Sequence, residues 1–148
     1  MSSNRTRLAA ASALCALGMA LPGFALADKD GKDPECSPRT LHGAYLFSAT
    51  GFTSASGAMV PKAIVERIDF NGDGTLHVTG ATVSINGNVF RSPPGDATYD
   101  LPGPSCVGTL TFNPSLHFDI FVSPNGHDLT MIQTDTGNVF QGKVTRLK

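Results

Sequence analysis

The sequence predicts an all-β fold, and within that class an eight-stranded antiparallel up-and-down β-barrel. Two observations carry this prediction. From Cys36 onward, apolar and polar residues alternate with the period of two that strands require, and no stretch longer than a turn has helical periodicity. Short connections rich in Gly, Asn and Pro separate the alternating segments, which is typical of hairpins. A two-sheet β-sandwich is the alternative that the same pattern permits.

The first 27 residues have the composition of a secretory signal peptide. Arg5 and Arg7 precede an apolar run at 8–21, and the small-residue sequence Ala25-Leu26-Ala27 follows it. The apolar run is shorter than the roughly 20 residues of a membrane-spanning helix, and no later segment is long enough. We therefore expect cleavage near Ala27, a secreted or periplasmic location, and no membrane span.

Cleavage at this point leaves 121 residues, enough for one domain. Residues 28–35 (DKDGKDPE) are charged and poor in apolar groups, which predicts a disordered leader before a single domain at 36–148. The remaining 12 acidic and 9 basic residues give a formal charge of −3 without a basic stripe, so nucleic acid is not an expected partner.

Two cysteines, Cys36 and Cys106, remain after the predicted cleavage. An oxidising compartment predicts a disulfide between them, with a reactive thiol as the alternative. Such a bridge closes a loop of about 70 residues and stabilises the fold by roughly 4 kcal/mol in the chain-entropy model. Two cysteines without a nearby histidine pair do not support a zinc site.

Eight strands are expected, each bounded by turn-forming residues: 42–52, 58–70, 74–86, 88–101, 106–113, 116–123, 127–135 and 138–147. Short connections predict that sequential strands pair antiparallel, and pairing of the eighth strand with the first removes both exposed edges. The sequence RSPPGD at 91–96 interrupts the fourth strand, because proline cannot donate to a strand ladder, and predicts a bulge or flap at the rim.

The alternation also predicts which side chains point into the barrel. The inward apolar residues are expected to be Tyr45, Phe47, Ile64, Ile68, Phe70, Leu76, Val78, Tyr99, Leu110, Phe112, Phe118, Ile120, Leu129 and Met131, with the polar Glu66, Thr82, Ser84 and Gln133 on the same faces. An eight-stranded barrel is either filled by its own side chains or holds one small ligand. For the second case, the candidate ligand-binding residues are Tyr45, Phe47, Glu66, Tyr99, Phe112, Phe118, Met131 and Gln133.

The stretch IDFNGDGTLHVTG at 68–80 begins with the ligand spacing of a calcium loop, formed by Asp69, Asn71 and Asp73. A helix-loop-helix site needs a glutamate at the twelfth position of the loop, which here is Gly80, and the flanking segments alternate as strands do. We therefore expect a hairpin turn at 71–74. A weak calcium site on that turn is the alternative.

Glu66 is the inward residue best suited to act as a catalytic acid or base. Burial raises the pKa of a carboxyl group and so allows acid or base chemistry near neutral pH. The alternative is a structural carboxyl that reaches the rim or bonds to Tyr or Gln side chains. The histidines at 77, 117 and 127 fall on outward faces or at a strand start, which argues against a histidine base or metal ligand.

Several segments carry a family resemblance: LHGAYLFSATGF at 41–52, IVERIDFNGDGTLHVTGATVSINGNVF at 64–90, YDLPGPSCVGTLTF at 99–112 and IQTDTGNVFQGKVTRL at 132–147. They resemble a group of small secreted bacterial proteins of unassigned role, which are similar to calycin-like barrels of the allene oxide cyclase type. The shared motifs are strand and turn motifs. The resemblance implies a barrel and, as one possible activity, a cofactor-free isomerase or cyclase in which Glu66, Tyr45 or Tyr99 orients the substrate.

The favoured function is therefore a non-enzymatic barrel that binds a small apolar or amphipathic molecule, or a partner, outside the cytoplasmic membrane. The cofactor-free cyclase and a purely structural envelope protein are the alternatives. No nucleotide loop, metal-ligand set or catalytic triad occurs in the sequence, so no cofactor is expected.

Overall fold

The computed structural model describes residues 35–148, so the predicted signal peptide and nearly all of the predicted leader lie outside the described part of the chain. The elements are two short 3₁₀ helices and nine strands: η1 (Pro38–Thr40), β1 (His42–Ala55), β2 (Ala58–Asn71), β3 (Thr75–Ile85), β4 (Asn88–Ser92), β5 (Gly95–Asp100), β6 (Val107–Phe112), η2 (Asn113–Ser115), β7 (Leu116–Val122), β8 (Asp128–Gln133) and β9 (Asn138–Arg146). Within residues 35–148, no helix has the length and apolar character that crossing a membrane requires.

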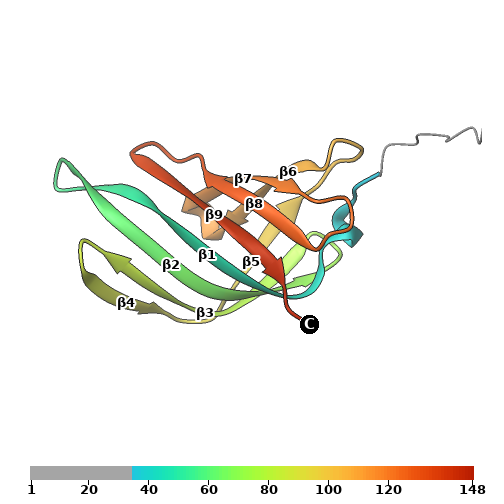
Figure 1. Ribbon diagram of the computed structural model, residues 1–148, viewed down its shortest axis with the longest axis horizontal. Coiled ribbons are helices and arrows are strands. Elements are labelled where there is room, and N and C mark those ends of the chain that lie inside the picture. Colours follow the sequence, from blue (N-terminus) through green and yellow to red (C-terminus); the bar gives the residue numbers. More distant parts are fainter. Residues whose placement is uncertain (1–34) are drawn as a thin grey trace, which may run out of the picture. The chain divides into compact units, whose positions relative to one another are not determined.

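The strands form a closed antiparallel barrel, as the alternation predicts. Each strand pairs with its neighbour in the order β1-β2-β3-β5-β6-β7-β8-β9, and β9 pairs back to β1 with Phe47 opposite Val144. The two margins of the sheet are therefore joined by main-chain hydrogen bonds. The predicted eight-stranded barrel is confirmed, and β4 is one additional strand outside the closed ring (Figure 1).

The predicted fourth strand is divided at its two prolines. Its first part, β4, pairs with the second half of β3, and its second part, β5, pairs with the first half of β3 and with β6. Pro93 and Pro94 lie between the two parts, where a residue without an N–H interrupts the ladder. Only β5 belongs to the ring. β4 therefore extends the sheet along the second half of β3, whose other edge stays paired with β2.

A bulge in β3 changes which residues face the interior. Glu66 pairs with Ala81 and Ile68 pairs with Val78, so β3 has one more residue than β2 over this step, and Gly80 within it has φ of 129°. The added residue reverses the facing of every later side chain in β3. The expectation that Thr82 and Ser84 point inward is therefore wrong.

The residues that take the inward positions instead are Ala81, Val83 and Ile85, which pair with Glu66, Ile64 and Lys62 of β2. Ala81 is buried, whereas Thr82 is exposed and pairs with the exposed Val65. An alternation extrapolated from Leu76 and Val78 could not detect this reversal, because a bulge inserts a residue without changing the polarity pattern sharply.

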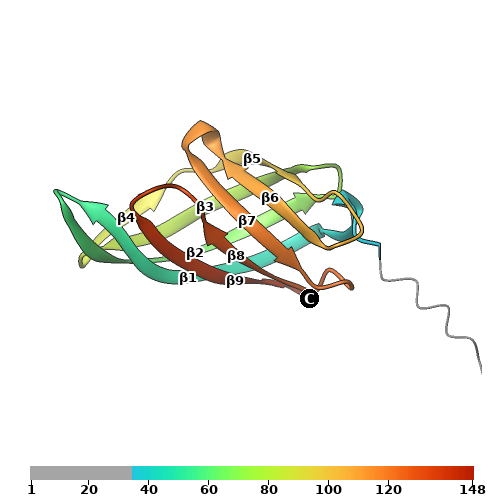
Figure 2. The same cartoon turned by 90° about the horizontal axis from the view of Figure 1, so that it is seen from above.

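The two ends of the barrel differ. The β1–β2 and β3–β4 hairpins extend together from one end, while η1 lies at the opposite end (Figures 1 and 2). The hairpins are joined by a hydrogen bond from the Asn86 N–H to the Pro61 carbonyl, 2.8 Å. We call the end that carries η1 the closed end and the end that carries the two hairpins the open end.

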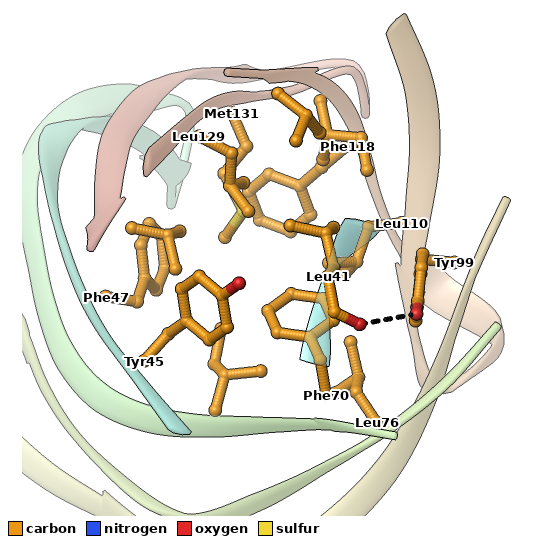
Figure 3. Close-up of a cluster of buried hydrophobic side chains, with 14 of the residues drawn as sticks. Leu41, Tyr45, Phe47, Phe70, Leu76, Tyr99, Leu110, Phe118, Leu129 and Met131 are labelled. Carbon is orange, nitrogen blue, oxygen red and sulfur yellow. Dashed lines mark hydrogen bonds between the residues drawn. The ribbon is translucent and has the colours of Figure 1, made fainter. Parts of the chain in front are cut away.

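The hydrophobic core fills the ring of strands, and large side chains from most strands meet there (Figure 3). The fully buried members with the largest side chains are Tyr45, Phe47, Phe140, Leu41, Ile68, Leu76, Leu101, Leu110, Ile120, Leu129, Met131 and Val144. The predicted disulfide between Cys36 and Cys106 is present, with the two Cα atoms 5.0 Å apart. It ties the segment before η1 to the beginning of β6.

Candidate functional site

The closed end is sealed by the segment that precedes β1. Leu41 has no exposed surface and packs into the core beneath η1. The Tyr99 hydroxyl holds this segment, because it lies 2.7 Å from the Pro38 carbonyl and 3.1 Å from the Leu41 carbonyl. Figure 3 shows the contact between Tyr99 and Leu41. Burial raises the pKa of Tyr99, which keeps the hydroxyl protonated as a donor.

A second tyrosine completes the seal. The Tyr45 hydroxyl donates to the Gly126 carbonyl at 2.6 Å and accepts from the Arg146 guanidinium at 2.7 and 3.0 Å. Phe70 lies between the two tyrosines, with edge-to-face ring contacts of 5.1 Å on each side. Because backbone carbonyls and Arg146 already occupy both hydroxyls, we assign Tyr45 and Tyr99 to the closure of the barrel and not to a ligand.

The remaining apolar residues of the predicted lumen belong to the core or pack against it. Phe47, Phe118 and Met131 are buried, and Phe118 makes an edge-to-face contact of 5.6 Å with the half-buried Phe112. These side chains fill the interior of the barrel, and the polar groups of the open end lie on the rim side of them. Two buried polar residues stand in this region, Glu66 and Gln133.

Gln133 belongs to a chain of polar contacts along the rim of the open end. Its side-chain N–H donates to Asp135 at 2.8 Å, and its carbonyl accepts from Lys62 Nζ at 3.3 Å. Asp135 also accepts from the His117 backbone N–H at 2.9 Å and contacts His117 Nδ1 at 2.6 Å. The hydrogen bonds from His117 and Gln133 lower the pKa of Asp135 to about 2, so the carboxyl group is ionised at neutral pH.

Lys62 reaches across the opening from β2. Gly51 of β1 pairs with both Lys62 and Phe140, and because it has no side chain the lysine can pass over it. The ammonium group lies 4.2 Å from the centre of the Phe140 ring. Burial lowers the pKa of Lys62, and the charge of Asp135 partly opposes that change.

Glu66 lies deeper than Lys62 on the same inward face of β2. Its neighbours across the strands are Phe47 on β1 and Ala81 on β3, and only 8% of the residue is exposed. Among the described residues 35–148, no hydrogen-bond or ion-pair partner of the Glu66 carboxyl is found. No fully enclosed side-chain oxygen in that range lacks a partner, so the unpaired carboxyl oxygens keep a small contact with solvent.

Loss of hydration without a compensating partner raises the pKa of Glu66 to about 7. At neutral pH the group is therefore divided between the acid, which can donate, and the carboxylate, which can only accept. A buried polar group without a partner costs free energy. A ligand that hydrogen-bonds to Glu66 would recover part of that cost.

An apolar surface continues outward from Glu66 on the inner face of the two hairpins. Ile64 of β2, Val83 of β3 and Phe90 of β4 stand in one row across the three strands. Ile64 and Val83 are half-buried and Phe90 is exposed. The open end thus combines an apolar wall with one unpaired carboxyl at its base.

The residues of the predicted calcium loop are engaged within the hairpin that joins β2 and β3. The Asp73 carboxylate accepts from the Thr75 backbone N–H at 2.9 Å and from the Thr75 hydroxyl at 2.7 Å, and the Asn71 amide donates to that hydroxyl at 2.8 Å. Asp69 is bonded to Arg67 at 2.9 to 3.2 Å. These contacts account for the three residues as turn and surface groups, and the predicted hairpin is present. Within residues 35–148, no group of three or more His, Cys, Asp or Glu side chains is arranged to hold a metal.

The three histidines that the sequence places on outward faces or at a strand start, His77, His117 and His127, are exposed, and each contacts a carboxylate. His77 Nδ1 lies 2.8 Å from Asp96, and His127 Nδ1 lies 3.1 Å from Asp128. A separate groove of about 660 Å³ lies on the outer wall, where Thr75, Thr98 and Thr111 stand in one row across β3, β5 and β6. Unlike the open end, this groove has no buried polar side chain among its lining residues.

Sequence reasoning identified Glu66, Gln133 and the inward aromatic residues, and the structure buries both polar side chains without a contact between them. It missed Lys62, Val83 and Phe90. The alternation of β2 places Lys62 on the same face as Ile64 and Glu66, but a lysine is normally expected to extend into solvent. Val83 and Phe90 could not be assigned without knowing the bulge in β3.

No protein-family model matches the sequence, and the search of curated proteins found no match.

Proposed function

We propose that this protein is a small-molecule-binding barrel whose site is the open end. The ligand is a small amphipathic molecule. Its apolar part lies against Ile64, Val83 and Phe90, and its polar part is a hydrogen-bond donor, such as a hydroxyl or an amine, that reaches Glu66. One observation carries the proposal: Glu66 is more than nine-tenths buried, has no described partner, and stands at the base of an apolar surface that opens to solvent.

General features of ligand sites support this assignment. The mouths of β-barrels are common ligand sites, and such sites are mostly apolar with a few polar groups that orient the ligand. The rim chain of Lys62, Gln133 and Asp135 is satisfied by its own members, so it frames the opening and leaves Glu66 as the group that needs a partner. We also propose a secreted or periplasmic location, for which the signal-peptide composition and the disulfide are the support.

The test is calorimetric titration of the purified protein with decanol and decylamine, and with decanoate as a ligand that lacks the donor. We expect the first two to bind, and Glu66→Leu to weaken them about tenfold, which is typical of the loss of one hydrogen bond to a charged group. Decanoate should bind less well than decylamine, because it places a second carboxylate beside Glu66.

Asp96→Leu is the matched control, because it removes an exposed carboxylate from the outer groove. It should leave both affinities unchanged. If Asp96→Leu weakens binding and Glu66→Leu does not, the site is the outer groove and our assignment is wrong. If native mass spectrometry detects neither a co-purified nor a loaded molecule, the structural alternative is favoured, since side chains already fill the closed half of the barrel.

A second candidate, a cofactor-free isomerase or cyclase, is favoured by one specific observation, the pKa of Glu66 at about 7. Such a group exchanges a proton readily at neutral pH. Glu66→Gln separates the two functions, because glutamine keeps the hydrogen bond but cannot transfer a proton. Turnover that Glu66→Gln abolishes while binding persists would establish catalysis. Binding without turnover in both forms would exclude it.

A further inference from the structure

The tips of the two hairpins at the open end contain no charged residues. The uncharged segments run from 43 to 61 through the β1–β2 turn and from 78 to 90 through the β3–β4 turn. Each segment is followed directly by a cation, Lys62 in the first hairpin and Arg91 in the second. In a protein with 16% charged residues, two adjacent uncharged tips define one distinct region of the surface.

Large apolar side chains are exposed in this region. Phe52, Met59, Val89, Phe90 and Val139 have exposed fractions between 49% and 65%. Phe52 stands beside Pro61 and Val139 in one outward row across β2, β1 and β9. Contiguous exposed apolar residues on a soluble domain mark an interaction surface.

The apolar side chains lie on both faces of the continuous sheet that β1 to β4 form at this end. Phe90 points to the inner face with Val83, whereas Val89 points to the outer face with Ser84. Phe52 and Met59 also belong to the outer face, because they pair with Pro61 and Ser54. A protein partner with one flat surface covers one face of this sheet and leaves the other in water. A lipid matrix surrounds the end of the sheet on both faces.

We propose that the open end docks on a phospholipid bilayer. The two hairpin tips insert their apolar side chains at the boundary between headgroups and acyl chains. Arg91, which follows the second uncharged segment and is exposed on the outer face beside Thr82, is then at the level of the lipid phosphates, while Lys62 keeps its contacts with Gln133 and Phe140. In this orientation the apolar wall and Glu66 open toward the membrane, so an amphipathic molecule could pass between the bilayer and the barrel without crossing water. Docking itself does not depend on the proposed ligand.

The test is flotation of the purified protein with vesicles of phosphatidylcholine and phosphatidylglycerol, without any added amphiphile. The wild type should float with the vesicles. The double variant Phe52→Asp, Phe90→Asp should lower the partition coefficient at least about tenfold, because it brings two charges into the apolar layer. Phe121→Asp is the matched control, since Phe121 is 52% exposed but lies on β7 at the closed-end side of the barrel, and it should float as the wild type does.

A second measurement tests the proposal even if the double aspartate variant fails to fold. The chain contains no tryptophan, so one introduced indole reports its own surroundings. Emission of Phe52→Trp should shift to shorter wavelength when vesicles are added, and emission of Phe121→Trp should not. Absence of flotation, or equal shifts at both positions, would overturn the proposal. Sedimentation velocity that finds a wild-type dimer, dissociated by the double aspartate variant, would instead identify a second copy as the occupant.

Discussion

The closed and open ends of this barrel are built from the same kind of strand, yet they differ in the hydrogen bonding of one buried polar group. At the closed end, both tyrosine hydroxyls bind backbone carbonyls and Arg146 adds a further contact. At the open end, Glu66 is equally enclosed but has no described partner. Buried polar groups with hydrogen-bond partners are typical of a region that stabilises the fold. A buried polar group without a partner near an opening is typical of a ligand-binding site.

Among the changes that test this comparison, loss of the disulfide at the closed end should have the largest effect on stability. Replacement of both Cys36 and Cys106 by serine should lower the free energy of unfolding by about 4 kcal/mol, because the bridge closes a loop of about 70 residues. Urea denaturation, followed by circular dichroism, measures the change. Ligand binding at the open end should persist under conditions in which the variant stays folded. A loss below about 1 kcal/mol would mean that the closed end does not depend on the bridge.

A pair of truncations sharpens the difference in packing. Leu41→Ala removes a side chain with no exposed surface and should cost about 3 kcal/mol. Ile64→Ala removes a half-buried side chain from the apolar wall of the open end and should cost about 1 kcal/mol, because the remaining space is open to solvent. Both values come from the same denaturation measurement. Equal costs would show that the open end is packed as tightly as the closed end.

The last expected effect concerns the protonation of Glu66. Its pKa in the folded state, about 7, exceeds the reference value of 4.5, so the folded state holds the proton more tightly than the unfolded state. The associated stability is fully present below pH 4.5 and is lost as the pH rises through about 7, by at most about 3 kcal/mol. Glu66→Gln should remove this decline.

Denaturation of both forms at pH 5 and pH 8 measures that contribution, and Asp96→Asn is the control because it replaces an exposed carboxylate. The control should keep the wild-type pH dependence. A wild-type protein that is equally stable at both pH values would show that the Glu66 carboxyl has a partner in solution, which would remove the distinction between the two ends.

Much of the fold could be predicted because its determinants are local. Alternation and turn residues indicated antiparallel strands, closure of the ring, the interruption at Pro93 and Pro94, and the hairpin at 71–74. The part that failed was also local in cause. One extra residue near Gly80 reversed the direction in which Thr82 and Ser84 point, because a bulge shifts the inward and outward alternation by one residue.

The candidate site was predictable only in part. The inward position of Glu66 followed from its place in the alternation of β2, and its capacity for acid or base chemistry followed from its burial. Its lack of a partner did not, because any inward hydroxyl or amide from another strand could have bound it. One of the two partners of Gln133 is likewise Lys62, a residue separated from it by 71 positions.

By itself, the sequence determined the pleat, the order of strand pairing and the cysteines available for a bridge, since these depend on neighbouring residues and on short turns. Only the tertiary structure decided that one end is closed by η1 and Leu41, that two uncharged hairpins extend from the other, and that Glu66 stands unpaired between them. The physical reason is that the burial and hydrogen bonding of a side chain depend on groups that the chain brings together from distant positions.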